Sequence, residues 1–290
     1  MNMNKILVSI ILFFAAVMPS VAQTKDGGIS ADMLREITKQ HKSTAADKAL
    51  FNAIAANNID DLATNYATKG ALNNHFSIET KEQSITDQKR SGRCWMFSGF
   101  NVLRSAFATR TDSLSVELSQ GYLFFWDQLE KSNLFLQGVI DNASKPIDDN
   151  RVQFFFKGPI NDGGTFCGVA DLVDKYGLVP KQIMPETFSS DNTSKATSLI
   201  KSKLREYGLI LRDMVAAGKK QTAIKAEKTR MLTDVYRMLC LVFGEPPTQF
   251  DYAFTDKKGV AKTETKTYTP MSFAKEILGD KQIKGSFIMV

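Results

Sequence analysis

The sequence contains few cysteines and few histidines: three cysteines and two histidines among 290 residues. Three cysteines are too few for a disulfide-rich scaffold, and no Cys/His or Asp/Glu cluster has the spacing of a metal site. The sequence also lacks a glycine-rich phosphate-binding loop and a Gly-x-Ser-x-Gly nucleophile elbow. We therefore expect neither a metal ion nor an organic cofactor.

The sequence has no strong excess of either charge. It contains 37 Lys+Arg against 31 Asp+Glu, for a net charge of +6. This excess is compatible with an anionic partner, but over this length it does not favour nucleic acid or a membrane surface. Hydrophobic residues make up 43% and charged residues 23%. These proportions are typical of a globular protein and exclude collagen-like, coiled-coil and wholly disordered chains.

The one long apolar run lies at the N-terminus. Lys5 precedes an apolar run over residues 6–17, and Ser20 and Ala22 have the small-x-small spacing of a signal peptidase site. The run is short for a membrane span, so an N-terminal anchor or a buried helix is the less favoured alternative. We predict a signal peptide over residues 1–22 and an exported bacterial protein, periplasmic or secreted, without a membrane span after cleavage.

Apolar periodicity and capping residues predict a chain rich in helices, followed by a short strand hairpin. We expect helices over residues 45–56, 94–108, 118–129, 165–176, 195–217 and 221–243. Strands are expected at 250–254 and 263–268, and Thr269 and Pro270 begin a last helix. Residues 189–194 are predicted to be a linker. This order of elements indicates an α+β protein.

The segment that leads up to Cys94 gives the clearest indication of a catalytic site. Because Cys94 opens an apolar helix, its thiol meets the positive end of the helix dipole and unsatisfied N–H groups, which favour the nucleophilic thiolate. Gly92 permits a tight turn, and Arg93 adds positive charge. The amide of Gln88 can fold back beside the sulfur and, with the Cys94 N–H, stabilise an oxyanion. The alternative is that Cys94 is a small buried hydrophobic residue.

This stretch resembles the papain-like cysteine peptidases, whose signature is Gln, a short gap, then Cys-Gly-(Ser/Ala)-Cys-(Trp/Tyr). Ser91 stands where the signature has its first cysteine, which normally forms a disulfide near the active site. The bleomycin hydrolase/aminopeptidase C branch is a closer match. The segments that carry this resemblance are 88–95, 119–126, 161–164 and 176–187. The resemblance covers residues 45–290 and implies aminopeptidase activity on peptides and a hexameric ring.

Asn161, Asp162, Gly163 and Gly164 form the predicted substrate-binding segment. Two consecutive glycines let a peptide backbone approach closely and pair in an extended conformation. In papain-like enzymes the matching Gly-Gly lines the cleft wall opposite the nucleophile. Without the context of Cys94, the same four residues would indicate only a tight turn.

The resemblance implies a papain-like fold of class α+β, mostly its helical half with an inserted helical pair and with the barrel-like half largely absent. The predicted divisions are a signal peptide (1–22), an N-terminal arm (23–58), a helical domain with the nucleophile (59–192), an inserted helical hairpin (193–245), and a strand hairpin that begins the second half (246–290).

A base for the thiol is the missing component. His41 and His75 both precede Cys94, whereas the histidine and asparagine of papain-like enzymes follow the cysteine. We expect neither to be the base, and we read the apolar residues 285–290 as a strand cut short. The chain is thus expected to be the N-terminal part of a longer enzyme and inactive by itself.

Three alternatives stay open. The chain could be a non-catalytic half-enzyme that binds peptides or a partner chain. The lysine-rich helical pair allows a weaker third hypothesis, a nucleic-acid surface, although a solvated face is favoured. For Cys167 and Cys240, two buried free thiols are favoured over a disulfide.

Overall fold

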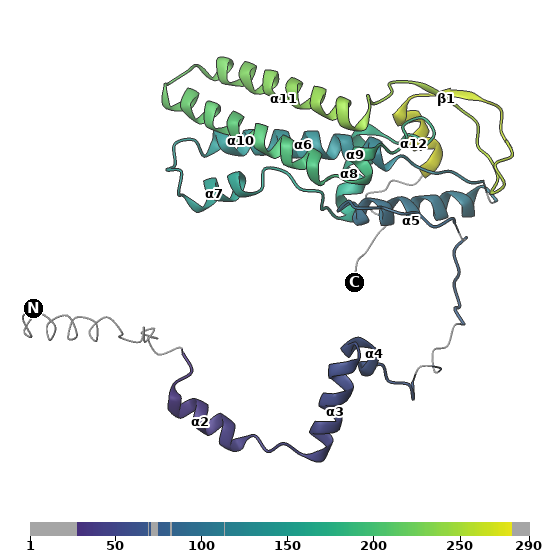
Figure 1. Cartoon of the computed structure of the whole chain (residues 1–290). Coiled ribbons are helices and arrows are strands. Elements are labelled where there is room, and N and C mark those ends of the chain that lie inside the picture. The colour runs from purple at the N-terminus through teal and green to yellow at the C-terminus, as the bar shows by residue number, and fades with distance from the viewer. Residues whose placement is uncertain (1–27, 69, 71–74, 82, 113, 280–290) are drawn as a thin grey trace, which may run out of the picture. The chain divides into compact units, whose positions relative to one another are not determined.

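The computed structural model describes residues 28–279 except 69, 71–74, 82 and 113 (Figure 1). The predicted signal peptide and the apolar residues 285–290 lie outside the described residues. The chain divides into two units, one up to Phe76 and one from Ser77 onward. This division falls further along the chain than the predicted end of the arm at residue 58. No helix that the structure describes is long and apolar enough to cross a membrane.

The described residues of the first unit form three helices: α2 (Ala31–Gln40), α3 (Ala45–Ala56) and α4 (Ile59–Ala63). The helix predicted over residues 45–56 is confirmed, and a capping box of Thr44 and Asp47 begins it. The sequence predicted no helix before residue 45, but Ser30 accepts a hydrogen bond from the Met33 N–H and begins α2. None of the side chains on these three helices is buried.

In its described residues the second unit combines helices with an antiparallel strand pair, which confirms the predicted α+β class. The helices are α5 (Cys94–Arg110), α6 (Gln120–Asp141), α7 (Asn150–Lys157), α8 (Phe166–Tyr176), α9 (Phe188–Asp191), α10 (Ser194–Ala216), α11 (Gln221–Phe243) and α12 (Pro270–Leu278). The strands β1 (Phe250–Tyr252) and β2 (Lys266–Tyr268) pair with Phe250 opposite Tyr268. The two long helices α10 and α11 lie side by side, and both pack on α6 (Figure 1).

An aromatic cluster joins the strand pair to α5 and α12. The ring of Phe254 lies 5.0 Å from Phe107 of α5 and stacks on Phe273 of α12 at 5.7 Å, measured between centroids. Tyr252 and Tyr268 contact the same Phe273 ring edge to face. These packed rings bury large apolar areas, so they fix the far end of α5 and thereby the direction in which α5 presents its first residue.

Helix boundaries follow local capping chemistry. Gly177 directly follows the predicted helix end at residue 176 and ends α8 at φ +78°. A Cβ there would lie 2.3 Å from the Pro270 backbone, so only glycine fits. Thr269 and Ser272 form the capping box of α12. The predicted linker at 189–194 is instead partly α9, because Thr187 and Ser190 form a capping box.

Helix α6 is longer than predicted. It continues to Asp141 rather than ending near Leu129. Residues 130–133 are polar, but Phe135, Leu136 and Val139 continue the buried face of the helix. The added length carries Lys131, which reaches the segment that contains Gly163.

Candidate active site

Cys94 is the first residue of α5, and its side chain is exposed as a free thiol. The predicted place of Cys94 at a helix N-terminus is therefore confirmed, and a small buried hydrophobic residue does not describe it. Arg93 holds the N-cap position without a side-chain cap. Its carbonyl accepts from the N–H groups of Met96 and Phe97 at 2.9 and 3.1 Å. Within the described residues the Cys94 N–H has no acceptor, so it remains a donor for a bound group.

Arg93 stabilises the loop that precedes α5 through its buried side chain. Its side chain is fully buried, and its guanidinium donates to both carboxylate oxygens of Glu186 at 2.9 and 3.1 Å and to the Ser190 carbonyl at 2.8 Å. It also lies over the rings of Phe97 and Phe124. The sequence suggested that Arg93 adds positive charge at the thiol. The structure instead pairs this charge with Glu186, and Arg93 anchors the start of α5.

Gln88 closes a tight turn before the nucleophile. Its side-chain amide donates to the Ser91 carbonyl at 2.7 Å, and the Ser91 hydroxyl donates back to the Gln88 carbonyl at 2.7 Å. Lys89 between them has φ +52°, a left-handed conformation stabilised by its N–H donating to Asp87 at 2.8 Å. An amide carries two N–H hydrogens, so one remains for the predicted oxyanion.

Asp162 links the glycine segment to the nucleophile loop. Its carboxylate accepts from the hydroxyls of Thr193 and Thr197 and, at 3.4 Å, from the Gly92 N–H. Its carbonyl accepts from the indole of Trp95 at 2.7 Å. A Cβ on Gly92 would lie 2.8 Å from the Asp162 Cβ, which explains the glycine. These internal bonds make Asp162 a structural link between the two segments, and its predicted part in substrate binding stays a prediction.

Gly163 and Gly164 have different surroundings. A Cβ on Gly164 would lie 2.5 Å from the ring of Trp95, whereas a Cβ on Gly163 would meet only the side chain of Asn161 at 3.4 Å. Asn161 accepts from the Gly163 N–H at 3.0 Å. Gly164 is exposed, and among the described residues neither its N–H nor its carbonyl has a partner. Two such backbone groups can pair with an extended peptide, and the predicted role of this segment in substrate binding stays a prediction.

The sequence did not predict the residues of α6 that hold the glycine segment (161–164) in place. Lys131 donates to the carbonyls of Asn161 and Gly163 and to Asp127, and Gln128 donates to the same Asn161 carbonyl at 3.0 Å. Burial raises the pKa of Asp127 to about 6, although Lys131 and the Gln128 amide partly offset this rise. The Asp127/Lys131 spacing of four residues on α6 was the available signal.

The other titratable candidates are two histidines and two further cysteines. His41 and His75 belong to the first unit, and their exclusion as the base stays a prediction. Cys167 is exposed and Cys240 half-buried, and both are free thiols, so the expectation of two buried thiols is wrong for Cys167. Burial raises the pKa of Cys240. The described residues contain no group of three or more His, Cys, Asp or Glu side chains arranged to hold a metal ion.

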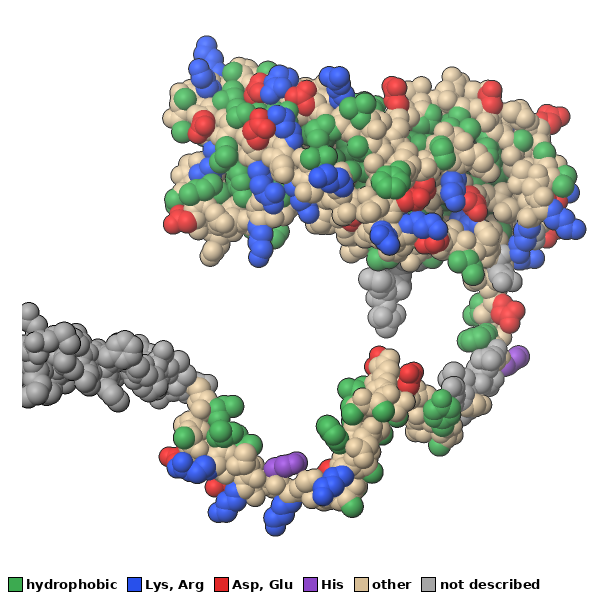
Figure 2. Space-filling view, viewed as in Figure 1, with side chains coloured by type: hydrophobic (Ala, Val, Ile, Leu, Met, Phe, Trp, Pro, Cys, Tyr) green, Lys and Arg blue, Asp and Glu red, His purple; other side chains and the backbone are tan. Residues whose placement is uncertain are grey.

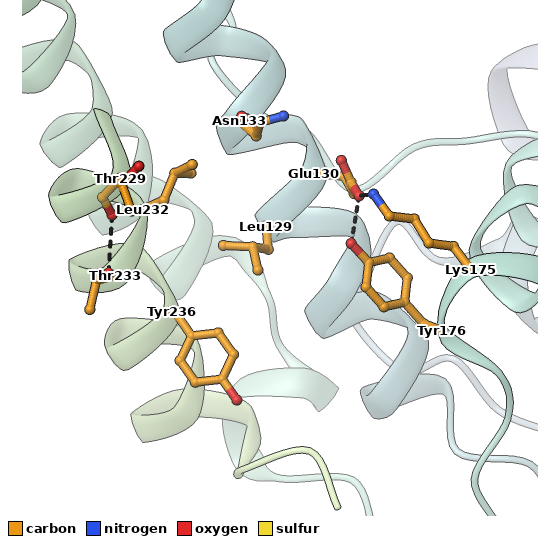
Figure 3. Close-up of a pocket in the computed structure, with 9 residues that line it drawn as sticks. All are labelled: Leu129, Glu130, Asn133, Lys175, Tyr176, Thr229, Leu232, Thr233 and Tyr236. Carbon is orange, nitrogen blue, oxygen red and sulfur yellow. Dashed lines mark hydrogen bonds and ion pairs between the residues drawn. The ribbon is translucent and has the colours of Figure 1, made fainter. Parts of the chain in front are cut away.

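A separate groove of about 410 Å³ lies between α6, α8 and α11 (Figure 3). It is lined by Leu129, Glu130, Asn133, Lys175, Tyr176, Thr229, Leu232, Thr233 and Tyr236. Glu130 accepts from the Tyr176 hydroxyl at 2.5 Å and pairs with Lys175. The groove contains none of the predicted site residues.

The lysines and arginines of α10 and α11 are partly neutralised by acidic neighbours. Arg230 pairs with Glu227 and Asp234, and Lys203 pairs with Glu206. Figure 2 shows positive and negative side chains side by side on this face of the second unit. A mixed surface of this kind is typical of a solvated helical pair, which was the favoured interpretation of these charges.

The helical fold, with an exposed cysteine at the start of a buried helix, is that of the papain-like class of proteins. The chain belongs to the Peptidase C1-like family, which it matches over residues 28–286. It is 38% identical to aminopeptidase C of Lactobacillus delbrueckii subsp. lactis over 251 residues, which are 87% of this chain and 56% of that protein. It is 35% identical to aminopeptidase C of Streptococcus thermophilus over 255 residues, or 87% of this chain and 57% of that protein.

Among solved structures, PepW from Lactobacillus rhamnosis is similar, with a TM-score of 0.79 and 36% identity over 89% of this chain and 57% of PepW. The chain thus spans a little over half the length of the relatives it matches. These matches confirm the resemblance to the aminopeptidase C branch that the motifs predicted.

Proposed function

We propose that this chain carries the nucleophile-bearing half of a thiol-dependent aminopeptidase of the bleomycin hydrolase type. The observation that supports this most strongly is the exposed Cys94 at the uncapped start of α5. The thiolate attacks the carbonyl carbon of a peptide, and the new oxyanion accepts from the Cys94 N–H and the second N–H of Gln88. The C–N bond then breaks, the amine leaves with a proton from the base, and water hydrolyses the thioester.

The backbone of Gly164 holds the substrate in this proposal. An extended peptide accepts a hydrogen bond from the Gly164 N–H and donates one to its carbonyl, in the manner of an added strand. Gly163 and Asn161 shape the turn that exposes these two groups. Asp162 acts through Gly92 and Trp95, by fixing the distance between the glycine segment and the start of α5.

The base in this proposal belongs to the part of the relatives' length that this sequence does not match. The motivation is that both histidines precede Cys94. Without a base, turnover is expected to fall by a factor on the order of 10⁶, the loss seen when one member of a catalytic triad is removed. The same observation favours a second candidate function, a half-enzyme that binds peptides or a partner chain without cleaving them.

The test is hydrolysis of an aminoacyl-coumarin amide by the full-length protein. Cys94→Ala is expected to lower kcat by at least about 10⁴-fold, whereas Cys167→Ser, which removes the other exposed thiol, leaves it within about twofold. Activity that survives Cys94→Ala would contradict the proposal. Saturable peptide binding without turnover in the wild-type protein would favour the half-enzyme.

We also propose that the protein is exported and that it assembles with copies of itself. The first proposal is supported by Lys5, the apolar residues 6–17 and the Ser20/Ala22 spacing. The second follows from the resemblance to hexameric enzymes of the bleomycin hydrolase type. N-terminal sequencing of the native protein should begin at Gln23, and light scattering should give a mass several times that of one chain. An intact N-terminus or a monomer would contradict the respective proposal.

A further inference from the structure

Lys131 contacts the glycine segment from behind. Its ammonium nitrogen lies 2.9 Å from the Asn161 carbonyl oxygen, 2.7 Å from the Gly163 carbonyl oxygen and 2.7 Å from Asp127 Oδ2. A lysine ammonium has three N–H donors, so these three acceptors use all of them. Most of the Lys131 side chain is buried, with 22% of its surface exposed.

The bond to Gly163 fixes the direction of the next N–H. The Gly163 carbonyl and the Gly164 N–H belong to one peptide unit, and a trans peptide is planar with its C=O and N–H pointing in opposite directions. Because Lys131 draws this carbonyl toward α6, the Gly164 N–H points away from α6. Gly164 is exposed there, and its N–H has no acceptor within the described part of the chain.

The surroundings hold Lys131 in one position. Asp127, one turn earlier on α6, pairs with the ammonium and is itself 9% exposed. Gln128 donates to Asp127 at 2.9 Å and to the Asn161 carbonyl at 3.0 Å, so it bridges two of the acceptors of Lys131. The Trp95 ring centroid lies 5.7 Å from the ammonium, within the range of a cation–π contact.

We propose that Lys131 is a positioning residue, which orients the Gly164 N–H toward the backbone of a bound peptide. The inference rests on the proposed function, because it assumes that a peptide lies along Gly164 beside Cys94. Lys131 does not touch the peptide. It acts through the Gly163 carbonyl, so it sets how tightly a peptide binds and not how fast the Cys94 thiol reacts.

The experiment compares two thiol reagents on the protein as purified. An epoxysuccinyl dipeptide must bind along Gly164 before it alkylates Cys94, so its labelling rate saturates and yields both KI and kinact. Iodoacetamide has no peptide to align and reports thiol reactivity alone. For Lys131→Met we expect KI to rise about tenfold, the effect of one hydrogen bond. The kinact and the iodoacetamide rate at Cys94 should stay within about twofold.

Lys175→Met is the matched control. Lys175 pairs with Glu130, which is also on α6, but it lies in the separate groove and contacts neither Asn161 nor Gly163. Its KI should equal that of the wild-type protein. If Lys131→Met is not recovered folded, Lys131→Gln replaces it. Its amide can still donate to one carbonyl, and a smaller rise in KI is expected.

The outcomes separate the two proposals. A KI that rises in the Lys131 variant but not in the Lys175 variant supports the positioning role. An unchanged KI in a folded Lys131 variant, with saturable labelling of the wild-type protein, overturns the positioning role and leaves the proposed function in place. Wild-type labelling that does not saturate overturns the proposed function and, with it, the role of Lys131.

Discussion

Two helix starts in this molecule carry an exposed cysteine, and they differ in how the helix is capped. Cys94 is the first residue of α5 and Cys167 the second residue of α8. At α8 the Thr165 hydroxyl accepts from the Gly168 N–H, as an ordinary N-cap does. At α5 the N-cap position holds Arg93, whose side chain caps nothing. The α5 end therefore keeps N–H donors for a ligand, whereas the α8 end is partly satisfied by its own chain.

This difference shifts the stabilisation of α5 to other contacts. An N-cap side chain contributes about 1 kcal/mol to stability, and α5 does without it. The loop before α5 is held instead by the buried Arg93/Glu186 pair, by the reciprocal Gln88/Ser91 bonds and by the Arg90 N–H donating to Asp191 at 2.9 Å. A helix start can thus stay open to ligands when its supporting contacts lie in the interior.

Among the variants that test how the start of α5 is held, Arg93→Met should lower the free energy of unfolding the most. The substitution leaves the Glu186 carboxylate, 14% exposed, without its partner, and breaking a buried ion pair costs about 3–5 kcal/mol. The matched control in the same loop is Lys89→Met. It breaks an exposed pair with Asp87 and should lower stability much less than Arg93→Met, because water screens an exposed ion pair. Urea denaturation measures both, and equal losses would show that the interior of the loop does not support α5.

The second-largest effect is a pH dependence of stability that arises from Asp127, the partner of Lys131 behind Gly163. Burial raises the pKa of Asp127 from 3.8 to about 6, so the folded protein holds this proton more tightly than the unfolded chain. The protonated Asp127 carboxyl therefore stabilises the folded protein below about pH 4, and this stabilisation is lost as the pH rises through about 6. The free energy of unfolding that is lost over this pH range is on the order of 3 kcal/mol.

Asp127→Asn should remove that loss. The stability of the variant relative to the wild-type protein should therefore increase between about pH 4 and pH 6, as measured by thermal unfolding across this range. A difference between the two proteins that does not change with pH would show that the Asp127 carboxyl titrates as it does in the unfolded chain.

Gly164 and Gly163 offer a smaller and sharper contrast. Gly164→Ala places a methyl group 2.5 Å from the Trp95 ring and should cost about 1–3 kcal/mol, the typical cost of overpacking. Gly163→Ala meets only Asn161 at 3.4 Å and should change stability by less than about 0.5 kcal/mol. Denaturant titrations of the two variants test this order. The reverse order would mean that the Trp95 ring moves aside freely.

Apart from the comparison variants, the smallest expected loss of stability comes from removing Thr165, the N-cap residue of α8. Thr165→Ala frees the Gly168 N–H near Cys167 and should cost about 1 kcal/mol or less, since the hydrogen bond is long at 3.5 Å. With the N–H groups at the start of α8 less satisfied, iodoacetamide should alkylate Cys167 about two- to fivefold faster. An unchanged rate at Cys167 would indicate that capping does not explain the difference between the two helix starts.

The sequence predicted the parts of this molecule that depend on local signals. Apolar periodicity located α5, α8, α10 and α11, and Thr269 and Gly177 marked helix ends by their capping chemistry. Motif spacing indicated Cys94, Gln88 and the glycine segment. The burial of Arg93, the inward bonds of Asp162 and the reach of Lys131 were not predictable in this way, because each depends on a contact at least thirty residues away in the chain.

The most direct test of the central claim is to map where a peptide-like reagent attaches. The wild-type protein is incubated with an epoxysuccinyl dipeptide, digested and examined by mass spectrometry for adducts on Cys94 and Cys167. We predict an adduct on Cys94 and none on Cys167 at the same reagent concentration, although both thiols are exposed. Equal labelling of the two cysteines, or labelling of Cys167 alone, would contradict the claim that the start of α5 is built to receive a peptide.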